Sequence, residues 1–352
     1  MTKRVRQNKP DLASQIRDHS EKKVEKVDYE GDMKLVVSTG STLLDLAISG
    51  GRVRGGGIPS GILAEVFGPS GSGKSVLLSE IAGNVQRAGG DVIFYDPEAR
   101  LNPQFARMFG LEFEGLNYSS PDTVPQVFKG VRDWQPENDK VVNGVFADSL
   151  AALSTDLEME NKEGDKMGMR RAKEFSEELR KTCRVIKQKN YLMVCSNQVR
   201  VNMDAGPYGQ KYMSPGGESI GFYSSLRLRA TKPEKIKAKK RVAGKEVSRV
   251  VGVRTEFEVF KSSIWKPHRS SPVTILFDYG IDDIRENIQF IKDFTHNTVY
   301  MIGERELSNV MEKAIEIVEN EGLEKELKSQ VIDLWESIES KFDSERKTKQ
   351  RW

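Results

Sequence analysis

The stretch that decides the fold is Ile62-Leu-Ala-Glu-Val-Phe67, which leads directly into Gly68-Pro-Ser-Gly-Ser-Gly-Lys74-Ser75. The first six residues form a mostly apolar run that is typical of a buried β-strand. The next eight fit the pattern G-x-x-x-x-G-K-[ST], and Ser75 to Arg87 has helical spacing. A strand, a glycine-rich loop and a helix in this order predict a phosphate-binding loop in an α/β fold.

The glycine-rich loop predicts a site for the polyphosphate of a nucleotide. Glycines let the backbone curl so that several N–H groups point at the phosphates, and the positive end of the following helix adds to the attraction. Lys74 would bridge the outer phosphates, and the Ser75 hydroxyl would coordinate Mg²⁺. An ordinary Gly/Ser turn is the alternative, but it would not require this strand and this helix. The predicted cradle consists of Gly68, Pro69, Ser70, Gly71, Ser72, Gly73, Lys74 and Ser75.

Nucleotide hydrolysis would also need a carboxylate that orients and activates water. Asp148 ends the apolar run Gly144 to Ala147, where an aspartate suits the outer coordination of Mg²⁺. Glu98 follows the run Asp91 to Tyr95, at a strand end of the kind where ligands of open α/β sheets gather. Spacing alone leaves both residues open to a second interpretation, a solvated loop carboxylate or a helix cap.

Further apolar runs extend the fold in both directions. The runs Asp91 to Tyr95, Gly144 to Ala147 and Tyr191 to Cys195 alternate with helical stretches, which predicts a mostly parallel central sheet flanked by helices. Leu226 to Ala230, Thr255 to Phe260 and Pro272 to Phe277 predict antiparallel strands that extend it. The basic stretch Lys232 to Lys245 predicts a hairpin between two of them, which could contact a duplex or could simply be solvated.

The ends of the chain differ from this core. Residues 1–34 are polar and charge-dense, and they predict an N-terminal arm with a short helix. Residues 35–285 form the predicted core. In residues 286–352 apolar positions recur every three or four residues, which predicts a small helical C-terminal domain followed by a frayed tail.

Composition excludes several classes of protein. The 352 residues contain 37% hydrophobic and 30% charged residues, as expected for a globular protein. No stretch approaches the roughly 20 apolar residues that span a bilayer, so no membrane partner is predicted. With two cysteines and no apolar leader, the expected compartment is the cytoplasm. The balance of 55 Lys+Arg against 52 Asp+Glu, a net charge of +3, is too nearly neutral to indicate a nucleic-acid partner by itself.

The core contains an ordered series of further motifs: Ser38-Thr-Gly-Ser41, the glycine-rich loop, Phe94-Tyr-Asp-Pro-Glu98-Ala-Arg-Leu-Asn-Pro103, Ser120-Pro-Asp-Thr123, Asp148-Ser-Leu-Ala-Ala-Leu153, Asn197-Gln-Val-Arg200 and Pro215-Gly-Gly217. Across residues 35–285 this series resembles the bacterial RecA recombinase family. The resemblance implies a RecA-like P-loop ATPase that uses ATP and Mg²⁺. It also implies a homo-oligomeric helical filament on single-stranded DNA that pairs this DNA with a homologous duplex and exchanges strands.

The resemblance also implies roles for individual residues near the nucleotide. Glu98 matches the family's water-activating glutamate, and Asp148 its second acidic motif. Asn102 and Phe105 fall where the family contacts adenine. Gln198 matches a glutamine that senses the terminal phosphate and reorders the following loop when that contact is lost.

Two glycine-rich stretches, Glu158 to Arg171 and Val199 to Gly217, match the family's DNA-facing loops. Polar loops of this length are uncommon unless they are functional or disordered. The resemblance implies that Met167 and Met203 insert between stacked bases, although a lone methionine more often fills a gap in a core. The residues expected to contact DNA are Met167, Gly168, Arg170, Arg171, Arg200, Met203, Gly216 and Gly217.

Departures from the family pattern concern the subunit interface. Lys261 matches the first of two lysines that reach the neighbouring protomer's ATP, but Ser263 stands at the second position. Lys266, three residues further on, is a candidate to replace that lysine. Phe222 matches an aromatic residue that packs across the interface, and an ordinary core position is the alternative.

Two other functions share this core. One is a ring ATPase or helicase, against which the N-terminal arm before Ser38 favours open head-to-tail growth. The other is a DNA-binding filament protein that is clamped by ATP and turns over little. Images of the complex with single-stranded DNA would separate a ring from a filament, and an ATPase assay with and without that DNA would identify a static clamp.

Overall fold

The computed structural model describes residues 35–155, 167–201, 212–213 and 219–343. Among the described residues, the contacts define two compact units that divide between Asp283 and Ile284. The predicted N-terminal arm and the end of the tail, residues 344–352, lie outside the described residues.

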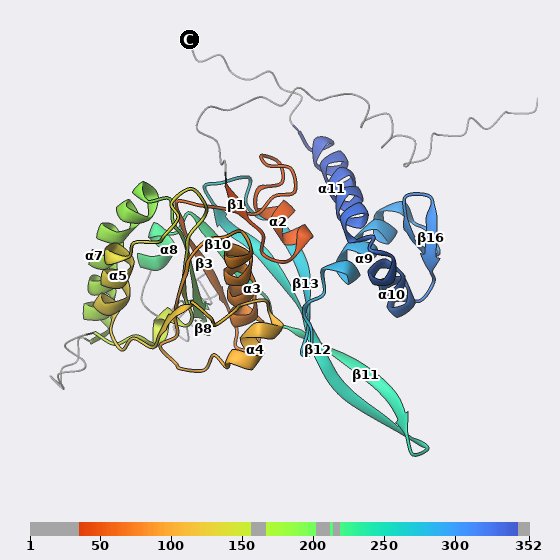
Figure 1. Cartoon of the computed structure of the whole chain (residues 1–352), viewed down its shortest axis with the longest axis horizontal. Helices are drawn as coiled ribbons and strands as arrows, with labels where there is room; N and C mark the ends of the chain where they lie inside the picture. The colour runs from red at the N-terminus through yellow and green to blue at the C-terminus, as the bar shows by residue number, and fades with distance from the viewer. Residues whose placement is uncertain (1–34, 156–166, 202–211, 214–218, 344–352) are drawn as a thin grey trace, which may run out of the picture. The chain divides into compact units, whose positions relative to one another are not determined.

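A ten-stranded sheet forms the centre of the larger unit, in the order β14-β13-β12-β10-β3-β7-β6-β4-β5, with β11 paired to β12 (Figure 1). All neighbours from β10 to β5 are parallel, which confirms the predicted mostly parallel sheet. The carboxyl ends of these strands meet at one edge, where ligands of open α/β sheets bind. The parallel strands are β10 (Leu226–Ala230), β3 (Ile62–Gly68), β7 (Leu192–Gln198), β6 (Gly144–Ala147), β4 (Val92–Tyr95) and β5 (Asn117–Ser119).

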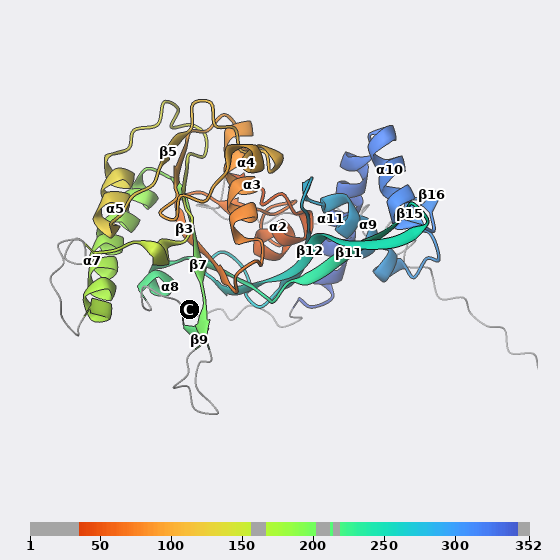
Figure 2. The same ribbon diagram turned by 90° about the horizontal axis from the view of Figure 1, so that it is seen from below.

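Helices cover both faces of the parallel strands (Figures 1 and 2). α2 (Thr42–Ser49) and α3 (Lys74–Arg87) contribute to one buried cluster, and α5 (Val124–Asp133) and α7 (Met167–Gln188) to the other. Neighbouring strand residues alternate between the two clusters: Phe94 packs in the first and Ile93 in the second. Because both faces are buried, these strands have continuous apolar runs in the sequence. Three shorter helices are α4 (Pro103–Met108), the 3₁₀ turn η1 (Leu150–Ala152) and α8 (Ser219–Tyr223).

Antiparallel strands extend the sheet beyond β10, as the sequence predicted. They are β12 (Lys245–Ser262), β13 (Ser270–Leu276) and β14 (Gly280–Ile281). β11 (Glu234–Val242) pairs only with the first part of β12, so the two leave the sheet as a two-stranded ribbon (Figure 1). Two short antiparallel pairs complete this unit: β1 (Val36–Val37) with β2 (Ile58–Pro59), and β8 (Arg200–Val201) with β9 (Tyr212–Met213).

The C-terminal part of the chain is mainly helical, with α9 (Asp283–Thr295), α10 (Met311–Glu321) and α11 (Glu324–Ser340). Ala314, Val318, Leu327 and Val331, at helical spacing, are all buried. A hairpin of β15 (Tyr300–Ile302) and β16 (Arg305–Ser308) precedes α10 and was not predicted. No described helix is both long and apolar enough to cross a membrane.

Candidate functional site

The glycine-rich loop joins β3 to α3 at the carboxyl edge of the sheet, as its sequence context predicted. Gly71 and Gly73 have φ angles of +73° and +84°, in the left-handed region that favours glycine. A Cβ atom at Gly73 would lie 2.3 Å from the Ile275 Cδ1 atom, so a side chain there would clash, whereas a Cβ atom at Gly71 would meet nothing within 4 Å. At Gly71 and Gly73 the curled backbone therefore carries no side chain, which allows phosphates to approach closely.

Lys74 begins α3, and its side chain folds back over the loop. Its ammonium donates hydrogen bonds to the carbonyl oxygens of Gly68 and Pro69, at 3.1 and 2.7 Å. Burial lowers the pKa of the Lys74 ammonium, while the negative charges of Asp148 and Glu98 oppose that shift. The cation is thus held in a desolvated position beside two carboxylates, where phosphate oxygens would be stronger acceptors than the two carbonyls.

Ser75 and Asp148 form the part of the site that fits Mg²⁺. The Ser75 Oγ atom donates to Asp148 Oδ2 at 2.6 Å, and the Ser196 hydroxyl donates to the other carboxylate oxygen. No group of three or more His, Cys, Asp or Glu residues that could hold a metal is found within the described ranges. One hydroxyl and one carboxylate with outer coordination are nevertheless what Mg²⁺ uses when phosphates and waters supply its other ligands. The residues present therefore fit a magnesium–nucleotide complex.

Glu98 lies on the turn after β4, at the same edge of the sheet. Arg100 pairs with it across 3.2 Å, and the Glu98 side chain is 23% exposed. The buried Asp96 fixes this turn by accepting hydrogen bonds from the Leu101 backbone N–H and the Tyr118 hydroxyl. The structure thus brings Glu98 after β4, Asp148 after β6 and Lys74 at the start of α3 together.

The two residues matched to an adenine site lie on α4. The Asn102 side chain caps this helix by accepting from the Gln104 backbone N–H at 2.8 Å. Phe105 is 39% exposed and packs edge-to-face on Phe109. Its exposed part leaves an aromatic surface on which a base could stack.

Gln198 is the last residue of β7 and lies beside the start of the glycine-rich loop. It is the register partner of Gly68, and the backbone N–H of the next residue, Val199, donates to the Gly68 carbonyl. The second predicted DNA-facing stretch begins here with the β8–β9 pair, in which Arg200 opposes Met213. Met203, Gly216 and Gly217 lie outside the described residues.

The first predicted DNA-facing stretch differs from expectation at its C-terminal end. α7 begins at Met167, so Met167, Gly168, Arg170 and Arg171 are helical and do not belong to a loop. The apolar face that buries Phe175 and Leu179 anchors this helix, and its regular turns continue back to Met167. Residues 156–166 lie outside the described part.

The predicted interface residues lie on α8, at the end of β12 and just after it. Phe222 is 76% exposed, so it is not a core aromatic residue within this chain. Lys261 donates to the carbonyl oxygens of Gly221 and Phe222, at 2.9 and 3.0 Å, and burial lowers the pKa of its ammonium. Ser263 donates to the Ser225 carbonyl, and the Lys266 ammonium lies 5.0 Å from the Trp265 ring centroid.

A buried ion pair beside the site was missed in the sequence. Glu65, with no exposed surface, accepts from Arg227 Nε at 2.6 Å and from Asn197 Nδ2 at 2.8 Å. The Arg227 guanidinium also lies over the rings of Phe67 and Phe260. This network ties β3 to β7 immediately before Gln198, and a glutamate inside an apolar strand was the only signal for it.

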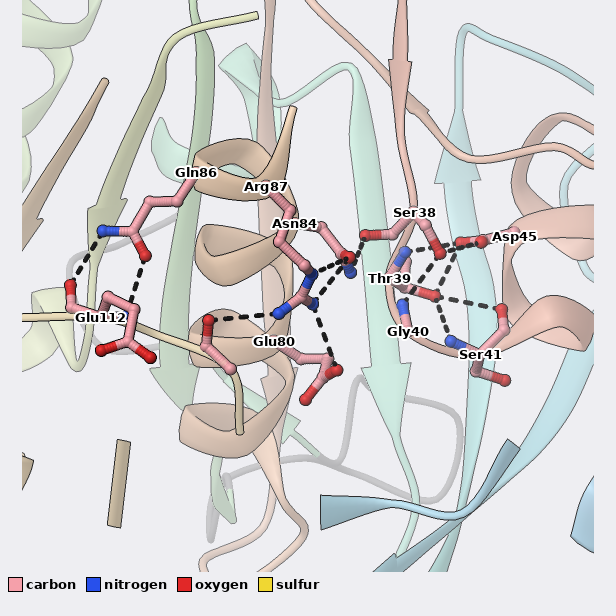
Figure 3. A network of polar contacts seen from close by, with 11 residues as sticks. Ser38, Thr39, Gly40, Ser41, Asp45, Glu80, Asn84, Gln86, Arg87 and Glu112 are labelled. Carbon is pink, nitrogen blue, oxygen red and sulfur yellow. Dashed lines mark hydrogen bonds and ion pairs between the residues drawn. The ribbon is translucent and has the colours of Figure 1, made fainter. Parts of the chain in front are cut away.

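A polar network fixes α3 to the segment that precedes α2 (Figure 3). Asp45 accepts from the backbone N–H and the hydroxyl of Thr39, and the Asn84 side chain donates to the Ser38 carbonyl. Glu80 lies in the same region on α3, 3.6 Å from Arg87. The network holds the helix whose first residue is Lys74.

Glu80 predicts a pH dependence of stability. Burial raises the pKa of Glu80 to about 7 from 4.5, Arg87 opposes this shift and Asp283 adds to it. The folded state therefore binds more protons than the unfolded state, and the free energy of unfolding should fall as the pH rises through this window. Urea titrations at several pH values measure this free energy of unfolding. Between these pH values it should fall less for Glu80→Gln than for the parent protein, whereas for the exposed Glu114→Gln variant it should follow the parent. Parallel curves for Glu80→Gln and the parent would contradict the shift.

Comparison with known proteins gives one consistent result. The family described as RecA N-terminal domain matches residues 14–282. Protein RecA of Thermus thermophilus is 32% identical over 304 residues, 85% of each chain. Protein RecA of Helicobacter hepaticus is 32% identical over 271 residues, which cover 77% of this chain and 72% of the relative. Protein RecA of Symbiobacterium thermophilum is also 32% identical, over 246 residues, which cover 70% of this chain and 66% of the relative.

Proposed function

Because the chain belongs to the RecA family, it is a DNA-dependent ATPase and recombinase, and we propose that residues 68–75 with Glu98 and Asp148 perform its ATP hydrolysis. The observation that carries this assignment is the meeting of Lys74, Ser75, Asp148 and Glu98 at one sheet edge. Asp148 directly follows β6, Glu98 lies on the turn after β4, and Lys74 and Ser75 begin α3, so backbone geometry fixes all four in advance.

Each residue at this edge has a distinct task in the proposal. Backbone N–H groups of the loop bind the phosphate chain, and Lys74 exchanges its carbonyl acceptors for outer phosphate oxygens. Ser75 and Asp148 hold Mg²⁺, which when bound neutralises the charge on the phosphates. Glu98 orients the attacking water and accepts a proton from this water. Asn102 and Phe105 bind the adenine.

Gln198 couples the nucleotide to DNA in this proposal. It lies opposite Gly68 and directly before the segment that starts with Arg200. A contact between its amide and the γ-phosphate would favour one arrangement of that segment, and loss of the phosphate would release it. Arg170, Arg171, Arg200 and the glycines Gly168, Gly216 and Gly217 would hold the DNA phosphates irrespective of base sequence. Met167 and Met203 would insert between stacked bases.

Arg200 offers a direct test of the DNA assignment. Arg200→Ala should weaken binding of single-stranded DNA in the presence of nucleotide and reduce the salt slope of log K by about 0.7 for the lost phosphate contact. Fluorescence anisotropy at several salt concentrations measures both quantities, with the exposed Lys140→Ala as control. An unchanged slope would remove Arg200 from the phosphate contacts.

A helical filament supplies the remaining residues of the proposed site. An exposed Phe222 next to Lys261 provides an aromatic and a cationic contact for a neighbouring protomer, and Lys266 is the candidate for a second cation.

Both cysteines are free, which agrees with the reducing cytoplasm we propose as the compartment.

Strand exchange tests the proposed function as a whole. With ATP we expect strand exchange between single-stranded DNA and a homologous duplex. With a non-hydrolysable analogue we expect homologous pairing, but no release of the protein from the DNA. Electron microscopy of the same mixtures should show open helical filaments. Closed rings, or filaments with no DNA-stimulated hydrolysis, would contradict the proposal.

A further inference from the structure

The β11–β12 ribbon concentrates positive charge in a chain that is nearly neutral. Residues 232–254 contain nine Lys and Arg residues and two Glu residues, a net charge of +7, whereas the whole chain has +3. The rest of the chain therefore carries −4. None of the residues matched to the nucleotide site or to the DNA-facing loops lies on this ribbon.

The charges are arranged on faces by the pairing of the strands. β11 pairs with β12 from Glu234↔Arg254 to Val242↔Lys245, and the one irregularity adds its extra residue to β12. Side chains of β11 therefore alternate regularly. Lys235, Lys237, Lys239 and Arg241 share one face, which we call the lysine face, and all four are exposed. Ile236 and Ala238, on the opposite face, are partly buried.

Little neutralises the lysine face from within the chain. In the described part of the protein, Lys239 pairs with Glu246 at 3.0 Å, and no ion pair involves Lys235, Lys237 or Arg241. Two-stranded ribbons are marginally stable in water, and like charges on neighbouring positions destabilise them further. A polyanion bound to this face would relieve the repulsion.

The lysine face is a regular row of positive charges, because side chains two residues apart on a strand are about 6.7 Å apart. A duplex carries about one charge per 1.7 Å of axis and is straight over this length. A single strand carries half that charge density and must lose conformational freedom to follow a stiff ribbon.

We propose that the lysine face of the β11–β12 ribbon is a binding surface for the phosphate backbone of duplex DNA. Lys235, Lys237 and Arg241 make its principal contacts, and Lys239 joins them where it leaves Glu246. Binding at this surface needs neither nucleotide nor base sequence, because the ribbon presents only cations to the backbone.

The ribbon offers its own matched control. The triple variant Lys235→Gln/Lys237→Gln/Arg241→Gln neutralises the lysine face. The variant Lys240→Gln/Lys245→Gln/Arg249→Gln removes two lysines and one arginine from the opposite face of the same ribbon. All six side chains are exposed, so both variants should fold and bind nucleotide like the parent.

The experiment measures binding of the full-length protein to a labelled duplex without nucleotide, across a series of salt concentrations. The lysine-face variant should bind about tenfold or more weakly at low salt, with a salt slope reduced by about 0.9 for each lost contact. The opposite-face variant should lose at most about twofold. Equal losses in both variants, or no loss in either, would overturn the proposal.

A second arm tests the choice of duplex and separates this proposal from the proposed function. The same variants are titrated with a labelled single strand, and an equal loss on both DNAs would overturn the duplex assignment. Because these titrations contain no nucleotide, Lys74→Ala should bind duplex like the parent. Normal hydrolysis stimulated by single-stranded DNA in the lysine-face variant would show that the nucleotide site is independent of the ribbon.

Discussion

Lys74→Ala should abolish nucleotide-dependent DNA binding. The Lys74 ammonium lies over the loop on two carbonyl acceptors and is the cation between Asp148 and Glu98. Its removal eliminates charge-assisted hydrogen bonds worth about 1.5 to 3 kcal/mol each and leaves two carboxylates facing the phosphates. We expect nucleotide affinity to fall at least about 100-fold, as measured by titration with a fluorescent ATP analogue.

The control for this variant is Lys140→Ala, which removes an exposed lysine of the same unit. It should retain the affinity of the parent for nucleotide and for DNA. Urea unfolding of both variants shows whether the core is intact. A Lys74→Ala protein that folds and still binds DNA normally in response to nucleotide would contradict the assignment of the loop.

Glu98→Gln should slow ATP hydrolysis by about 10² to 10⁴ while leaving ATP binding intact. Glutamine has nearly the same shape and can still accept a hydrogen bond, but it is a far weaker base for the proton of water. The buried Asp96 maintains the turn, so the backbone of the site should not change. Single-turnover hydrolysis in the presence of single-stranded DNA measures the chemical step apart from product release.

Arg100 provides the comparison for Glu98. Arg100→Gln breaks the 3.2 Å ion pair but keeps the carboxylate, and the Arg100 side chain is 73% exposed. Its hydrolysis rate should therefore remain within about tenfold of the parent, since exposed ion pairs contribute little. A Glu98→Gln variant with an unchanged rate would show that another group activates water.

The nucleotide site could be predicted because its signals are local in sequence. The loop, its strand and its helix are contiguous, and Asp148 and Glu98 directly follow apolar runs whose carboxyl ends must share an edge in a parallel sheet. The same locality explains why Glu65 was missed. Its partners Asn197 and Arg227 are 132 and 162 residues away, and no local pattern links them.

One boundary was wrong and one hairpin was missed, each for a physical reason. The glycine and the charges between Met167 and Arg171 indicate a loop when taken alone, but the buried face of α7 extends its helix over them. The sequence pattern did not reveal β15 and β16, because these strands have only three and four residues. Short elements of this kind depend on pairing that sequence periodicity does not record.

The turn at the end of the ribbon offers a place for a fluorescent reporter. Ala243 and Gly244 both have positive φ angles and should be kept, whereas Val242 directly before them is 59% exposed. The two natural thiols would react slowly, because Cys195 is buried and burial raises the pKa of Cys183 to about 11. A maleimide dye on Val242→Cys would thus label a single position, and its emission would signal the arrival of DNA in real time.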